Sequence, residues 1–76
     1  MNAATVKKFL EEKYSFEIRV RGERINELRY FYIYIPEWEQ AHARAISVAV
    51  NRLIQSKGFR GGCDVLADTL LAPKLA

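Results

Sequence analysis

The strongest strand signal in this chain of 76 residues is LRYFYIYI, residues 28–35, which stops at Pro36. Aromatic and β-branched side chains dominate this segment, which is the composition of a β-strand. Upstream, Phe16, Ile18 and Val20 alternate with charged residues, and this period of two predicts a half-buried strand that ends at Gly22. Residues 22–27 are polar and predict a turn, so we expect an antiparallel hairpin.

A short helix is expected before the hairpin. Thr5 is a candidate N-cap, and the helix then runs for about two and a half turns, to Lys13. Its spacing turns Val6, Phe9 and Leu10 to one side, where they can pack on the hairpin.

A long helix is expected after Pro36, reaching Lys57, with Gly58 as its C-terminal cap. The apolar side that the spacing predicts consists of Trp38, Ala41, Ala45, Ile46, Ala49, Val50, Leu53 and Ile54. The alanines in this set leave room for close packing on the sheet or on another helix.

The C-terminal segment has two interpretations. Gly61 and Gly62 predict a loop, after which Asp64 could cap a short helix over 65–72, or residues 65–71 could add a third strand beside the hairpin. A two-stranded sheet is marginal alone, so we expect this segment or a second protomer to cover it. The sequence therefore predicts one α+β domain over 1–76, in the order α-β-β-α followed by a short helix or a third strand.

The composition limits the number of domains, the disulfide bonds and the membrane segments that the chain can have. A chain this short holds a single core, and the one cysteine, Cys63, cannot close an intramolecular disulfide. The longest apolar runs fall far short of the roughly 20 residues that span a bilayer, and no export signal opens the chain. We expect a cytoplasmic protein with no membrane segment.

The net charge of +3 arises in the second half of the chain. No acidic residue occurs between Gln40 and Cys63, so the long helix and the loop after it should present a mildly basic surface. Its candidate partner-binding residues are Arg44, Arg52, Lys57 and Arg60. A charge of +3 is small beside the roughly six to ten phosphate contacts of a committed DNA-binding protein.

The hairpin supplies the leading functional feature. If Phe31, Ile33 and Ile35 face the core, the period of two puts three tyrosines and two arginines on the opposite side. Tyrosine and arginine are enriched at binding hot spots, because each combines a large contact area with directional hydrogen bonding. The candidate partner-binding residues of this face are Arg19, Arg21, Tyr30, Tyr32 and Tyr34.

Catalytic chemistry has little support. Cys63 and His42 would have to meet to form a nucleophile and base, and nothing in the sequence brings them together. One cysteine and one histidine cannot supply an ordinary four-ligand zinc site. We expect no catalytic residue, no metal and no cofactor.

The function expected from these features is non-enzymatic binding to a larger protein or complex, as an adaptor or an inhibitor. Phage and mobile-element anti-defence inhibitors such as anti-CRISPRs belong to this size class. The alternative is a domain for single-stranded RNA or DNA, in which bases stack on the tyrosines and Arg19 or Arg21 neutralises phosphates. The sequence also leaves open whether the protein forms a homodimer.

Overall fold

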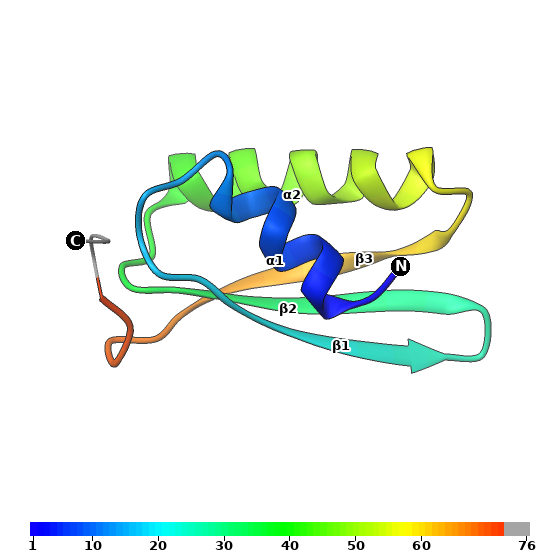
Figure 1. Cartoon of the computed structure of the whole chain (residues 1–76), viewed down its shortest axis with the longest axis horizontal. Coiled ribbons are helices and arrows are strands. Elements are labelled where there is room, and N and C mark those ends of the chain that lie inside the picture. Colours follow the sequence, from blue (N-terminus) through cyan, green and yellow to red (C-terminus); the bar gives the residue numbers. More distant parts are fainter. Residues whose placement is uncertain (73–76) are drawn as a thin grey trace.

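The elements of the computed structural model, which describes residues 1–72, follow one another in the order α-β-β-α-β (Figure 1). This confirms the predicted α+β class and element order. Of the two interpretations of the C-terminal segment, the third strand is correct and the short helix is wrong. The elements are α1 (Ala3–Glu11), β1 (Arg19–Ile25), β2 (Leu28–Ile35), α2 (Gln40–Ser56) and β3 (Arg60–Ala67).

β1 and β2 form the expected antiparallel hairpin, but β1 lies further along the chain than predicted. It begins at Arg19 and runs straight through Gly22, and the turn is reduced to Asn26 and Glu27. Asn26 has a φ of 56°, a left-handed conformation that asparagine tolerates. Gly22 lies opposite Phe31 in the β1–β2 pair, and a Cβ there would lie 3.3 Å from the Phe31 ring, so the glycine makes room for that ring.

β3 pairs with β2 in parallel, and α2 makes the crossover between them. The sheet order is β1-β2-β3, so β2 is central. The predicted loop at Gly61 and Gly62 is instead the start of β3. A Cβ on Gly61 would lie 1.7 Å from the Arg29 carbonyl oxygen, so its glycine serves a close approach of two strands.

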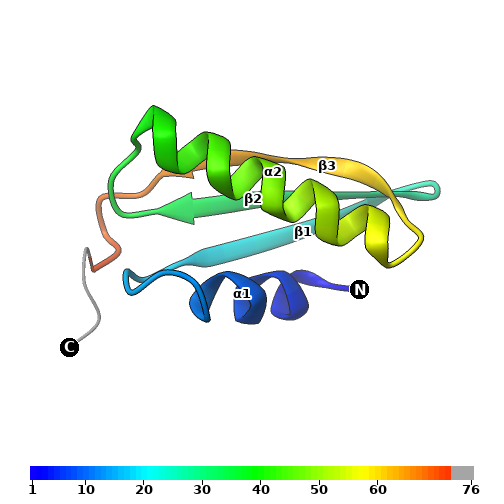
Figure 2. The same cartoon turned by 90° about the horizontal axis from the view of Figure 1, so that it is seen from above.

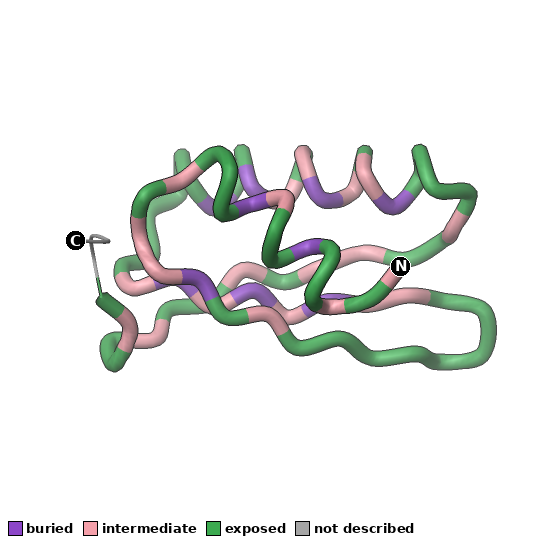
Figure 3. The backbone as a smooth tube through the Cα atoms, in the orientation of Figure 1, coloured by how far each residue is buried: buried purple, intermediate pink, exposed green. Residues whose placement is uncertain are grey.

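Both helices lie on the same face of the sheet (Figure 1). Seen from above, α2 runs over β2 and β3 while α1 lies beside β1 (Figure 2). The core lies between the helices and the sheet, where the buried stretches of the two layers face one another (Figure 3). It consists of Val6, Leu10, Ile18, Phe31, Ile33, Ile35, Ile46, Val50 and Ile54.

Three of the four helix ends differ from the prediction: both N-terminal ends, and the C-terminal end of α1, which lies at Glu11 rather than Lys13. Asn2, not Thr5, caps α1, and its Oδ1 accepts a hydrogen bond from the Thr5 N–H at 3.0 Å. α2 starts later than expected, at Gln40, and ends at Ser56. Gly58 is confirmed as the C-terminal signal: its φ is 80°, and the N–H groups of residues 58 and 59 donate to carbonyls in the last turn.

The apolar side of α2 is rotated from the predicted one. Ala43, Ile46, Val50 and Ile54 are buried at i, i+3 and i+4 spacing. Trp38, Ala41 and Ala45, which were expected in the core, are exposed. The wider predicted stripe covered more of the helix surface than the sheet can bury.

Residues 68–72 cross from the end of β3 towards β1. The Asp68 N–H donates to the Ile35 carbonyl at 2.7 Å, and the Ala72 N–H donates to Glu17 at 2.9 Å. Among the helices of residues 1–72, none is long and apolar enough to cross a membrane.

Candidate functional site

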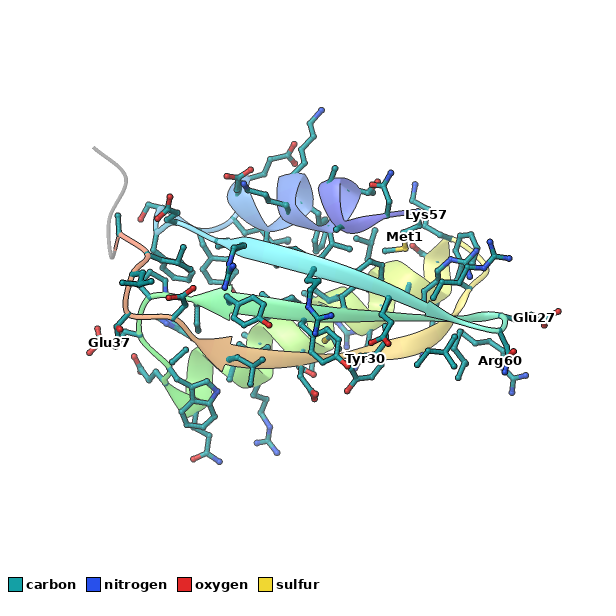
Figure 4. All side chains as sticks on the ribbon, turned by 90° about the horizontal axis from the view of Figure 1, so that it is seen from below. Met1, Glu27, Tyr30, Glu37, Lys57 and Arg60 are labelled. Carbon is teal, nitrogen blue, oxygen red and sulfur yellow. The ribbon has the colours of Figure 1, made fainter. Side chains whose placement is uncertain are left out.

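The face of the sheet opposite the helices carries no other element within residues 1–72. In the view from below, no helix lies in front of the three strands (Figure 4). Phe31, Ile33 and Ile35 are buried on the helix side, so the intervening tyrosines of β2 lie on this open face, as predicted. We call this surface, with the residues that flank the tyrosines on β1 and β3, the open sheet face.

The strand register sets four cross-strand rows on the open sheet face. Each row takes one residue from β1, one from the central β2 and one from β3. The rows are Arg19–Tyr34–Leu66, Arg21–Tyr32–Asp64, Glu23–Tyr30–Gly62 and Ile25–Leu28–Arg60.

The two predicted arginines cover tyrosine rings. The guanidinium carbon of Arg19 lies 4.5 Å from the Tyr34 ring centroid, and that of Arg21 lies 4.3 Å from the Tyr32 centroid. Both distances are within the range of a cation–π interaction. Arg19 also forms an ion pair of 2.9 Å with Asp68, so the segment after β3 holds that guanidinium in place.

The tyrosine hydroxyls meet acidic side chains. The Tyr32 hydroxyl donates to Glu23 at 3.1 Å, and this bond raises the pKa of Tyr32. Hydrogen bonding with Asp64, followed by burial, raises the pKa of Tyr30 to about 12. The rings of Tyr30 and Tyr32 meet edge to face, with their centroids 5.3 Å apart.

Sequence reasoning missed the apolar part of the open sheet face. Ile25, Leu28 and Leu66 are large hydrophobic side chains that stay 50%, 47% and 39% exposed. Ile25 and Leu28 also line a hollow of about 500 Å³ together with Tyr30. The signal for Leu28 was present, since it has the same parity as the tyrosines. Ile25 can be placed on this face only if β1 is known to continue past Gly22. Leu66 can be placed there only if the C-terminal segment is known to be a strand.

The charges of the open sheet face are balanced. Its basic groups are Arg19, Arg21 and Arg60, and the acidic groups on it or beside it are Glu23, Asp64 and Asp68. The surface is therefore amphipathic and carries no net excess of either sign.

The four predicted basic residues of the second half do not form one surface. Arg44 and Arg52 lie on one exposed surface of α2, whereas Lys57 follows the end of that helix. Arg60 belongs to β3 and to the hairpin end of the open sheet face (Figure 4).

Cys63 and His42 have separate surroundings. The Cys63 thiol lies 3.9 Å from Ser47 Oγ, and burial raises its pKa, which is the opposite of activation. His42 packs near Tyr14 and Phe16, with ring centroids 6.1 and 6.0 Å away. Within residues 1–72, no three histidine, cysteine or acidic side chains are grouped to hold a metal ion.

Comparison with protein-family models, curated proteins and solved structures gives no match to this chain.

Proposed function

We propose that this protein is a non-enzymatic binding module, an adaptor or an inhibitor, that binds a larger protein through the open sheet face. The observation that carries the proposal is an uncovered sheet surface with three tyrosines, two of which are held by arginine or acidic neighbours. With Cys63 as its one cysteine, the chain suits the reducing cytoplasm.

Two of the three tyrosines, Tyr32 and Tyr34, are held in place before any partner binds. Tyr34 lies under Arg19, which Asp68 fixes, and Tyr32 is held at its ring by Arg21 and at its hydroxyl by Glu23. Anchors that are already in place lose less conformational entropy on binding. Tyrosine also has only two side-chain torsions to fix, which makes it a rigid contact residue.

Exposed apolar side chains lie at both ends of the line of three tyrosines along β2. Leu28 and Ile25 flank Tyr30 at the hairpin end, and Leu66 lies beside Tyr34 at the other end. A contiguous apolar and aromatic surface with charged neighbours is the anatomy of a protein interface, with a dry centre and a polar rim.

Single-stranded nucleic acid is the less favoured partner. Bases need free aromatic faces, but guanidinium groups already cover one face of Tyr32 and one of Tyr34. The acidic groups Glu23 and Asp64 also lie among the tyrosines and would repel phosphates. A protein partner uses all of these groups, whereas a nucleic acid uses few of them.

Affinity capture with immobilised protein, in nuclease-treated extract of the native host, tests the proposal. Replacement of Tyr30, Tyr32 and Tyr34 by serine should abolish recovery of any partner that the wild type enriches. The matched control replaces three exposed residues of α1, Lys7, Lys8 and Glu11, by serine and should retain the partner. Recovery that survives the tyrosine replacements would refute the assignment of the face.

An oligonucleotide titration separates the two partner classes. Fluorescence anisotropy of labelled single-stranded RNA and DNA at about 0.15 M salt should show no binding at micromolar protein. Micromolar affinity that falls steeply with salt and is lost on replacing Arg19 and Arg21 would favour the nucleic-acid alternative.

A further inference from the structure

The outward side of α2 is unusual for a helix that packs on a sheet by one face. Its inward side buries Ile46 and Val50. On the opposite side, the centre of the helix is again apolar, with Ala41, Ala45 and Val48 exposed. Val48, the largest of the three, has 43% of its surface exposed to solvent. A solvent-facing helix side ordinarily carries charged and polar residues along its length.

Two of the three charged groups around this apolar centre are basic. Arg44 and Arg52 lie on the same shallow, open surface of α2 as the three apolar residues. Neither arginine has a carboxylate within 4.0 Å among residues 1–72. Glu39 is the one acidic residue of this surface, and it lies before the first turn of α2. The two positive charges therefore lie on either side of the centre of the helix, one in each half.

We propose that this outward side of α2, centred on Ala45 and Val48, is a second docking surface, which takes an acidic amphipathic helix of a protein partner. Small side chains let two helix axes approach to about 8 Å. Arg44 and Arg52 are eight residues apart, or about 12 Å at 1.5 Å per residue, so carboxylates seven or eight residues apart on the partner helix can meet both.

A helical partner fits this surface better than an extended one. A helix satisfies its own backbone hydrogen bonds, whereas a strand laid across Ala41, Ala45 and Val48 would find no backbone partner. Nucleic acid fits poorly as well, because two arginines around an apolar centre fall short of the roughly six to ten phosphate contacts that affinity requires.

The outward side of α2 and the open sheet face lie on opposite sides of the molecule, because α2 covers the other face of the sheet (Figure 1). A ligand on one surface leaves the other accessible. The second docking surface is therefore independent of the proposed function, and either proposal can fail while the other stands.

Titration of isotope-labelled protein with a designed helical peptide tests the inference. The peptide carries alanine and leucine on one side, with glutamates at seven- and eight-residue spacing along its flanks. A matched peptide replaces each glutamate by lysine. The glutamate peptide should shift the methyl signals of Ala41, Ala45 and Val48 in NMR spectra and leave those of Leu28 and Leu66 unchanged.

Two variants of the protein test whether the peptide binds at this surface. Ala45→Glu places bulk and negative charge at the centre of the surface and should weaken the peptide at least about tenfold. Arg52→Glu should weaken it as well, and supplies the result if Ala45→Glu fails to fold. Lys8→Gln is the control, since it lowers the net charge as much as Ala45→Glu does but lies on α1, and it should change the affinity less than about twofold.

The inference is overturned by any of three results. The first is that the glutamate peptide shifts none of the three methyl signals. The second is that the lysine peptide shifts them equally. The third is that only a single-stranded oligonucleotide shifts them.

Discussion

The guanidinium of Arg21 stacks on the ring of Tyr32 directly across the β1–β2 pair, with 4.3 Å between the guanidinium carbon and the ring centroid. The hydroxyl of the same tyrosine donates to Glu23, two residues further along β1. One strand thus holds Tyr32 at both its ring and its hydroxyl. This arrangement makes the central tyrosine of the open sheet face a fixed anchor.

The coupling between Arg21 and Tyr32 is measurable as a double-mutant cycle. Arg21→Ala and Tyr32→Leu should each lower stability in urea denaturation, and the double variant should lose less than the sum of the two, because the stack is lost only once. Tyr32→Phe keeps the ring and removes only the hydroxyl. Arg21→Ala should therefore cost as much stability in the Tyr32→Phe variant as it does in the wild type. Strict additivity of Arg21→Ala and Tyr32→Leu would show that the stack contributes nothing.

Alkaline pH should destabilise the protein through Tyr30. Its folded-state pKa of about 12 is above the ordinary value of 10.0, so the neutral phenol is favoured in the fold. The contribution to stability is complete below pH 10 and is lost as the pH rises from 10 to 12, because the unfolded chain gives up its proton first. Asp64→Asn should lower the pKa of Tyr30, measured by ultraviolet absorbance of the phenolate. An unchanged titration would remove Asp64 as the cause.

Gly61 should tolerate no side chain. A methyl group there would overlap the Arg29 carbonyl oxygen, because the Cβ would lie 1.7 Å from it. Gly61→Ala should therefore cost on the order of 3 kcal/mol or more in the free energy of unfolding. Gly58→Ala meets no atom within 4 Å and has only its φ of 80° to accommodate, so it should cost about 1 kcal/mol. Equal losses in thermal melts would contradict the close approach of β2 and β3.

The two sides of α2 should respond differently to truncation. Ile46→Ala leaves a cavity between the helix and the sheet and should cost about 2–5 kcal/mol. Val48→Ala removes exposed atoms and should stay within about 0.5 kcal/mol. Chemical denaturation of both variants measures the difference. A large loss at Val48 would mean that the outward side of α2 is covered in the free protein.

The ion pair between Arg19 and Asp68 should contribute little to stability. The Arg19 side chain is 60% exposed, so Asp68→Asn should cost no more than about 1 kcal/mol, and the loss should shrink with added salt. Asp68→Ala also removes the oxygen that accepts from the Leu70 N–H, so this variant should loosen residues 68–72, seen as faster amide exchange at Leu70. Unchanged exchange at Leu70 in the Asp68→Ala variant would show that Asp68 does not hold residues 68–72 in place.

Local signals predicted the central part of the fold well. Residues 28–35 form β2 as expected, because alternation, aromatic content and Pro36 all act within a few residues of one another. Gly58 ends α2 for the same reason. The three tyrosines were placed on one face from parity alone, since the side-chain period of a strand is two.

Features that depend on distant partners were not predictable. β3 exists because it pairs along the whole of β2, and Gly61 looks like a loop residue until the Arg29 carbonyl is placed beside it. The buried side of α2 was also ambiguous, since alanines occur on both its inward and outward sides. The apolar ends of the open sheet face, Ile25 and Leu66, lie in the two strands whose bounds the sequence placed wrongly.

Hydroxyl-radical footprinting of the chain, free and with its captured partner, tests the central claim most directly. Tyr14 packs against Phe16 and His42, away from the open sheet face, and serves as an internal control. Oxidation of Tyr30, Tyr32 and Tyr34 should fall several-fold in the complex while that of Tyr14 stays constant. Equal oxidation of the three tyrosines in the free and bound protein would contradict the assignment of the open sheet face as the binding surface.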